Sequence, residues 1–101
     1  IIYDDIDIEP GIVKLRKKGG AGSHNGMKSV VENLKSTDFP HVRIGTGKPL
    51  IKSDLINYVI GKVSSEDYEI LLKGIETGRE AVEEILKNGI DKAMNVINSK
   101  N

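Results

Sequence analysis

Two segments of the chain alternate between apolar and polar residues, and a third is apolar until it meets a carboxylate. These segments predict short β-strands over residues 1–4, 12–16 and 41–45. In the second, Val13 and Leu15 face one side of the strand and basic residues face the other. The first strand, apolar up to its final aspartate, is expected to be buried.

Apolar residues then recur with helical spacing in four places. The spacing predicts helices over about 25–35, 53–61, 64–87 and 90–97. Asn25 is a good N-cap residue for the first of them. The apolar stripe of that helix comprises Met27, Val30, Val31 and Leu34.

The third predicted helix is the longest, and seven apolar residues are expected to line its buried face. They are Ile70, Leu71, Ile75, Ala81, Val82, Ile85 and Leu86. Glu83 and Lys87 are spaced for an ion pair on its surface. Strands and helices interleave in the first half and helices dominate the second, so the fold class is α/β. We expect a partial, mixed and twisted sheet with helices packed on it and a helical C-terminal part.

The chain has 101 residues, of which 38% are apolar and 30% charged. These values predict a single small domain over residues 1–101 and argue against a disordered tail. The chain contains no Cys, which excludes disulfides and thiolate metal sites. No apolar run approaches the roughly 18 residues of a membrane span, and we expect a cytoplasmic protein. The apolar start, without Met, suggests part of a longer protein.

Positive charge is concentrated in the first half, although the formal net charge is zero. Residues 1–52 hold nine Lys and Arg against six Asp and Glu, and residues 53–101 hold six against nine. This asymmetry predicts one surface that faces an anion.

Four carboxylates gather at the end of the first strand: Asp4, Asp5, Asp7 and Glu9. They could bind a hard cation, orient a histidine and stabilise its protonated form, or form a solvated strand end. The intervening isoleucines and the absence of EF-hand spacing argue against a calcium loop. The other two interpretations stay open.

A glycine-rich loop over residues 17–26 precedes the first helix and follows several basic residues. Backbone N–H groups in such a loop can approach an anion, so phosphate binding competes with a flexible connection. The P-loop pattern does not occur. His24 could act as a general base or contact a phosphate. A hydrolytic dyad with Asp4 is possible, but no Ser or Cys nucleophile motif accompanies it.

Four segments, in this order, resemble the bacterial-type peptidyl-tRNA hydrolase family. The first is Tyr-Asp-Asp-Ile-Asp at residues 3–7. The glycine-rich segment 15–29, ending His-Asn-Gly-Met-Lys-Ser, is the most specific. The Arg-Ile-Gly-Thr-Gly-Lys-Pro part of 39–49 and the segment 54–61 complete the match. The resemblance extends over residues 1 to about 85.

The resemblance implies an enzyme that cleaves the ester between a peptide and the 3′ ribose of tRNA, without metal or cofactor. Asp4 matches the aspartate that supports the family's histidine base, and that base matches no residue here. His24 matches a substrate-side histidine, which argues against the dyad. The residues expected to bind substrate or tRNA are Asn25, His24, Gly22, Arg16, Lys18 and Arg43. This hypothesis requires Asp4 and Asn25 to share a cleft.

The resemblance also implies a partner, the acceptor stem and 3′ end of peptidyl-tRNA, and a monomer that works in translation. The family is close to twice this length, so we expect a truncated domain, the C-terminal half, with little hydrolytic activity of its own. Two alternatives stay open. One is a non-catalytic RNA-binding relative, such as the plant organelle intron-splicing factors, and the other is a stable, inactive fragment.

Overall fold

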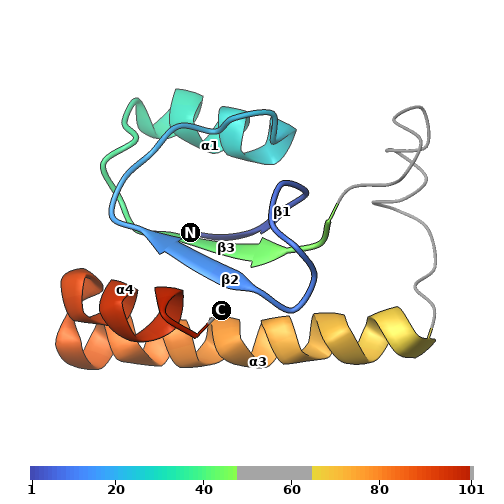
Figure 1. The fold of residues 1–101 in the computed structure, drawn as a ribbon. Coiled ribbons are helices and arrows are strands. Elements are labelled where there is room, and N and C mark those ends of the chain that lie inside the picture. Colours follow the sequence, from blue (N-terminus) through green and yellow to red (C-terminus); the bar gives the residue numbers. More distant parts are fainter. Residues whose placement is uncertain (48–64, 101) are drawn as a thin grey trace.

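The computed structural model describes residues 1–47 and 65–100 and has the predicted α/β architecture (Figure 1). Three strands form one mixed sheet: β1 (Ile2–Asp5), β2 (Val13–Arg16) and β3 (His41–Gly45). The central strand is β3, which pairs parallel with β1 and antiparallel with β2. The helix predicted over residues 53–61 lies outside the described residues.

Helices lie on both faces of this sheet. Helix α1 (Asn25–Leu34) lies on one side, and α3 (Ser65–Asn88) and α4 (Ile90–Asn98) lie together on the other (Figure 1). None of the helices in the described part of the chain is long and apolar enough to cross a membrane.

The apolar core lies between the sheet and the α3–α4 pair. As the alternation predicts, Val13, Leu15 and Val42 are at most 2% exposed and contact this helical layer. Ala81 of α3 and the α4 residues Ala93 and Ile97 complete the buried cluster. The other face of the sheet is therefore left with the intervening polar residues, and strand register decides which of them meet.

Register places basic and aromatic residues in rows on that polar face. Arg43 of β3 is opposite Tyr3 of β1 and Lys14 of β2, and His41 is opposite Arg16. Residues paired across neighbouring strands point to the same side of a sheet. The side chains that line the pocket described below come from these rows and from the loop that follows β2.

Two glycines lie on the face of α3 that packs against the sheet, together with Ala81, Val82 and Ile85. Gly74 and Gly78 are buried, and a Cβ atom on either would lie within 3.5 Å of Gly11 or Ile44. The prediction that Ile70, Ile75 and Leu86 belong to the buried face is wrong, because they are 43%, 54% and 81% exposed. A periodicity argument counts large apolar residues and overlooks a face built from glycine and alanine.

The first strand is also less buried than predicted. Ile1 and Ile2 are 50% and 56% exposed, because β1 is an edge strand of the described sheet. Leu34, at the last turn of α1, is 56% exposed as well. Met27 is the residue of the predicted α1 stripe that is completely buried.

The opposite edge strand, β2, is bonded by a side chain of α4. The Asn98 amide accepts a hydrogen bond from the Leu15 N–H at 2.7 Å and donates one to the Leu15 carbonyl at 3.1 Å. Both backbone groups face away from β3, so Asn98 bonds them as a neighbouring strand would. These two bonds fasten α4 to the sheet across 83 residues of sequence.

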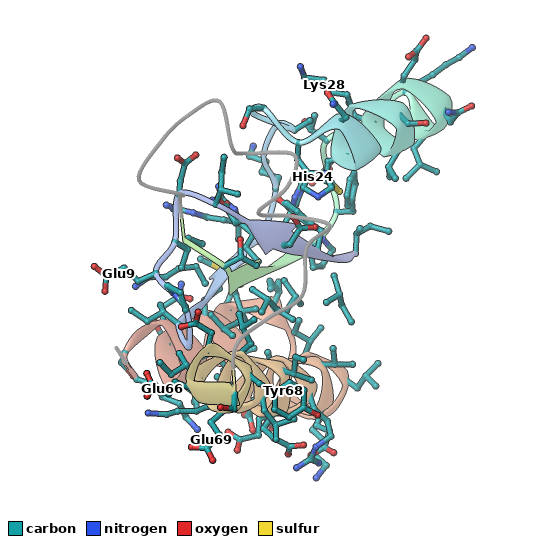
Figure 2. The ribbon with its side chains drawn as sticks, turned by 90° about the vertical axis from the view of Figure 1, so that its right-hand side faces the viewer. Glu9, His24, Lys28, Glu66, Tyr68 and Glu69 are labelled. Atoms are coloured by element: carbon teal, nitrogen blue, oxygen red, sulfur yellow. The ribbon has the colours of Figure 1, made fainter. Side chains whose placement is uncertain are left out.

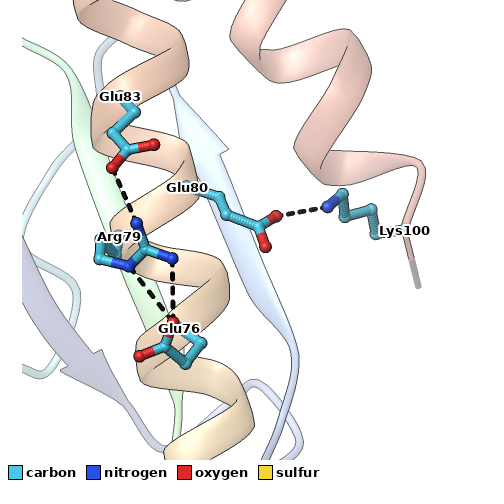
Figure 3. Close-up of polar contacts among 5 residues, drawn as sticks. All are labelled: Glu76, Arg79, Glu80, Glu83 and Lys100. Atoms are coloured by element: carbon cyan, nitrogen blue, oxygen red, sulfur yellow. Dashed lines mark hydrogen bonds and ion pairs between the residues drawn. The ribbon is translucent and has the colours of Figure 1, made fainter.

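Surface ion pairs join turns of α3 and connect α3 with the chain end (Figure 3). Arg79 binds Glu76 at 3.1 Å and Glu83 at 2.8 Å, so Glu83 pairs with Arg79 and not with the predicted Lys87. Lys100, just after α4, binds Glu80 of α3. These pairs are about half exposed, so solvent screens them and they contribute little to folding.

Candidate active site

The imidazole of His24 links the start of α1 to the first strand. Its Nε2 atom lies 2.8 Å from Oδ1 of Asp4, and its Nδ1 atom accepts a hydrogen bond from the Met27 backbone N–H at 3.0 Å. Figure 2 shows His24 between the helix and the sheet. The N-cap of α1 is therefore His24, and Asn25, predicted for that role, is the first helical residue.

These two contacts define the tautomer of His24. A nitrogen that accepts a backbone N–H carries no proton, so neutral His24 is protonated at Nε2 and donates to Asp4. Neither ring nitrogen is then available to take a proton from water. A hydrolytic His24–Asp4 dyad is one interpretation of the sequence, and the two side chains are in contact. In this geometry, however, His24 binds the carboxylate and cannot act as the base.

Asp4 remains accessible on its other side, since 47% of its side chain is exposed. Asn25 is exposed and directly follows His24, the residue that contacts Asp4, along the chain. Gly22, with a positive φ of 58°, turns the chain just before the cap. Of the predicted site residues, the structure thus brings Asp4 and His24 into contact where the glycine-rich loop meets β1, and a cleft shared by Asp4 and Asn25 stays a prediction.

Next to this pair is an open, basic pocket of about 410 Å³. Its lining includes four residues that the sequence predicts to bind tRNA: Arg16, Lys18, Gly22 and Arg43. The remaining lining residues are Tyr3, Gly19, Gly20 and His41. Three guanidinium or ammonium groups around one hollow favour an anion, and the glycines allow backbone to approach it.

Arg43 does not act as a free cation in this pocket. Its Nη2 atom lies 2.6 Å from Oδ2 of Asp5, whose side chain is only 8% exposed. Asp5 also accepts the Asp7 backbone N–H at 2.8 Å through Oδ1. The ion pair fixes the guanidinium in the pocket wall and offsets much of its charge, so Arg16 and Lys18 supply most of the positive potential.

The four carboxylates at the end of β1 do not converge on one point. Asp4 binds His24 and Asp5 binds Arg43. Among residues 1–47 and 65–100, no three His, Cys, Asp or Glu side chains are grouped so that they could hold a metal ion. Of the interpretations left open by the sequence, orientation of a histidine fits Asp4.

Two lining residues to which the sequence gave no role are Tyr3 and His41. The Tyr3 hydroxyl lies 2.9 Å from Nδ1 of His41, and His41 stacks on Phe39 with ring centroids 4.5 Å apart. Burial raises the pKa of Tyr3 above its ordinary value, although nearby Arg43 opposes this. Burial also lowers the pKa of His41, and the backbone of Thr37 partly offsets that effect. The alternation of β3 places His41 with Arg43, but nothing local indicates its partner on β1.

Comparison with solved structures defines the class of protein. The structure of peptidyl-tRNA hydrolase from Acinetobacter baumannii superposes with a TM-score of 0.85 and 31% identity. The match covers 96% of this chain and 49% of that one. The sheet and helices described here are therefore shared with a peptidyl-tRNA hydrolase.

Sequence comparison identifies the family. The sequence model described as peptidyl-tRNA hydrolase matches residues 1–101. Among similar proteins, the peptidyl-tRNA hydrolase of Clostridium botulinum (strain Eklund 17B / Type B) is 47% identical over 98 residues, 97% of this chain and 50% of that protein. That of Caldanaerobacter subterraneus is 45% identical over 98 residues, covering 52% of its length. The chain belongs to the peptidyl-tRNA hydrolase family and spans about half the length of these relatives.

Proposed function

We propose that the protein containing this chain hydrolyses the ester between a peptide and the 3′ end of tRNA. The observation that carries the proposal is the Asp4–His24 pair, 2.8 Å apart, beside a basic pocket. Family membership supports the reaction type. An oriented carboxylate next to an anion-binding hollow suits a substrate that combines a reactive ester with phosphates.

In the proposed reaction a water molecule attacks the ester carbonyl after losing its proton to a histidine. The family resemblance assigns this step to a histidine that matches no residue of 1–101. Asp4 would orient that imidazole and stabilise its charged form, which is what a carboxylate beside a catalytic histidine contributes. His24 would keep Asp4 in place, and Asn25, at the helix start, would hold water or the carbonyl through its amide.

The basic pocket would bind phosphates of the acceptor stem. Arg16 and Lys18 are exposed on its wall, and Arg43 is fixed there by Asp5. Such contacts recognise backbone and shape, so affinity would depend on salt more than on base sequence. We also propose that residues 1–101 form part of a single domain, and that the protein acts as a cytoplasmic monomer.

The decisive experiment measures peptidyl-tRNA hydrolysis by the complete protein that contains residues 1–101. Asp4→Asn should lower kcat by about 10²-fold or more, since it removes the support of the base. Glu9→Gln is the control, because it removes an exposed carboxylate far from His24 (Figure 2). Equal rates for Asp4→Asn and the wild type would refute the assigned role of Asp4.

The same assay addresses the non-catalytic alternative. An RNA-binding relative would retain tRNA affinity while the complete wild-type protein released no peptide. Salt-sensitive tRNA binding without any hydrolysis would therefore replace the proposed function with that alternative.

A further inference from the structure

Four rings form a continuous path from Phe39, through the pocket residues His41 and Tyr3, to His24 beside Asp4. Phe39 stacks on His41 with ring planes 12° apart. His41 is hydrogen-bonded to Tyr3, whose ring meets His24 at a centroid distance of 5.3 Å and an angle of 73°. His24 then binds Asp4. Tyr3 therefore both lines the pocket and contacts His24 of the Asp4–His24 pair.

The hydrogen bond between Tyr3 and His41 joins two neutral groups. The raised pKa of Tyr3 keeps its phenol protonated, and the lowered pKa of His41 keeps its imidazole uncharged near neutral pH. A phenolic O–H that donates to Nδ1 pairs these two atoms, while the other ring nitrogen of His41, Nε2, is buried without a hydrogen-bond partner among the described residues. His41 is 1% exposed and stacked, so it cannot follow a moving partner. It therefore serves as a fixed anchor for the Tyr3 ring.

A fixed Tyr3 ring restricts His24, whose side chain is 27% exposed and therefore only partly enclosed. The Nδ1–Met27 bond alone leaves the imidazole free to tilt about that contact. The edge contact with Tyr3 opposes this tilt, and the direction of Nε2–H toward Asp4 depends on it. Loss of the anchor would let the ring sample orientations in which the carboxylate is no longer held.

We propose that Tyr3, anchored by His41, is a positioning residue for the Asp4–His24 pair. The proposal rests on the function proposed above for its kinetic consequence, but its structural consequence can be measured without any substrate. Tyr3 acts through His24 and contacts no reacting atom. The nitrogen resonances of His24 and the rate of hydrolysis therefore test it separately.

The principal variant is Tyr3→Phe, which keeps the ring and removes the hydroxyl. The matched control is Tyr68→Phe, the same change on an exposed tyrosine of α3 (Figure 2). In the complete protein, ¹⁵N NMR of the wild type and the control should show His24 protonated at Nε2. Tyr3→Phe should shift both ring-nitrogen resonances toward an average of tautomers. It should also lower kcat roughly 3- to 10-fold with little change in KM, the effect of one hydrogen bond.

A second pair of variants at His41 keeps the proposal testable if Tyr3→Phe folds poorly. His41→Phe keeps the stacking on Phe39 but removes the acceptor and should reproduce the effect of Tyr3→Phe. His41→Asn places an acceptor near the position of Nδ1, so this variant should hydrolyse substrate faster than His41→Phe and at close to the wild-type rate. The double variant of Tyr3→Phe and His41→Phe should be no slower than either single one, because both remove the same bond.

The outcomes separate the two proposals. Unchanged His24 resonances in Tyr3→Phe, or changed resonances with an unchanged kcat, would overturn the role of Tyr3. A wild-type protein that hydrolyses nothing would instead overturn the proposed function, and the resonances would still decide whether Tyr3 orients His24.

Discussion

Arg43 stabilises the fold and also faces the pocket in which tRNA is proposed to bind. Its partner Asp5 is buried, so removing the guanidinium leaves a carboxylate without its cation in a poorly solvated place. A loss of tRNA binding in an Arg43 variant would therefore not by itself identify a contact with RNA. Arg16 and Lys18 are better probes, because the described structure shows no such pairing for them.

Arg43→Met is expected to destabilise the protein by about 3 kcal/mol, the usual cost of breaking a buried pair. Urea denaturation of the wild type and the variant measures the free energy of unfolding. The double variant Arg43→Met with Asp5→Leu should regain part of the loss, because it removes both charges. If the double variant were less stable than the sum of the two single changes predicts, the ion pair would not explain the loss.

His41 predicts a dependence of stability on pH. Its pKa in the folded state is below the ordinary 6.5, so the unfolded chain takes up this proton first on acidification. The contribution of His41 is therefore complete above about pH 6.5 and declines as the pH falls toward the lowered pKa. Thermal melts of the wild type should lose stability across this window. His41→Asn should lose less, and an equal loss in both would show that other groups are responsible.

At the level of strands and helices, close backbone approach determines where substitutions are tolerated. A Cβ atom on Gly45 would lie 2.1 Å from the Glu9 carbonyl oxygen, a contact that backbone cannot relieve locally. A Cβ atom on Gly74 would be 3.5 Å from Gly11 Cα, an ordinary contact. The two glycines are both buried, yet they differ in the space around them.

Gly45→Ala should therefore prevent stable folding, whereas Gly74→Ala should be neutral or stabilise the protein by up to about 1 kcal/mol through helix propensity. Thermal melts followed by far-UV circular dichroism would compare the two variants. Stable folding of Gly45→Ala would show that the turn over residues 6–9 can move away from β3.

The sequence predicts the described elements well, because their periodicity is local. The three strands and the helices α1, α3 and α4 occur where the spacing of apolar residues places them. The prediction of the buried face of α3 is partly wrong, since the buried Gly74 and Gly78 contribute nothing to a pattern of apolar side chains. The roles of Tyr3 and His41 were missed for another reason: they are 38 residues apart, and only strand register brings them together. The sequence predicts the Asp4–His24 contact as one possibility. The tautomer of His24, however, follows only from the hydrogen bond between its Nδ1 atom and the Met27 backbone N–H.

Over the whole molecule, the uneven charge distribution predicts a salt-dependent affinity for tRNA. Lys17 and Lys18 are neighbours, but only Lys18 lines the pocket, while Lys17 lies 3.6 Å from Asp91 of α4. Because the two residues have the same charge, any difference between them reports position rather than net charge.

In binding titrations of the complete protein with tRNA, Lys18→Gln should reduce the slope of log K against log salt by about 1. Lys17→Gln should leave that slope close to the wild-type value. If both substitutions changed the slope equally, the protein would bind through diffuse positive charge and the pocket would have no special part.

The bonds from Asn98 to β2 have a consequence for how the sheet can grow. A strand added beside β2 would have to displace an amide that already bonds both outward-facing groups of Leu15. Within residues 1–47 and 65–100 no such side chain bonds the outer edge of β1, whose isoleucines are half exposed. Among the described residues, an added strand would therefore meet less obstruction at β1 than at β2. Asp4 would then lie in the interior of a wider sheet instead of at its margin.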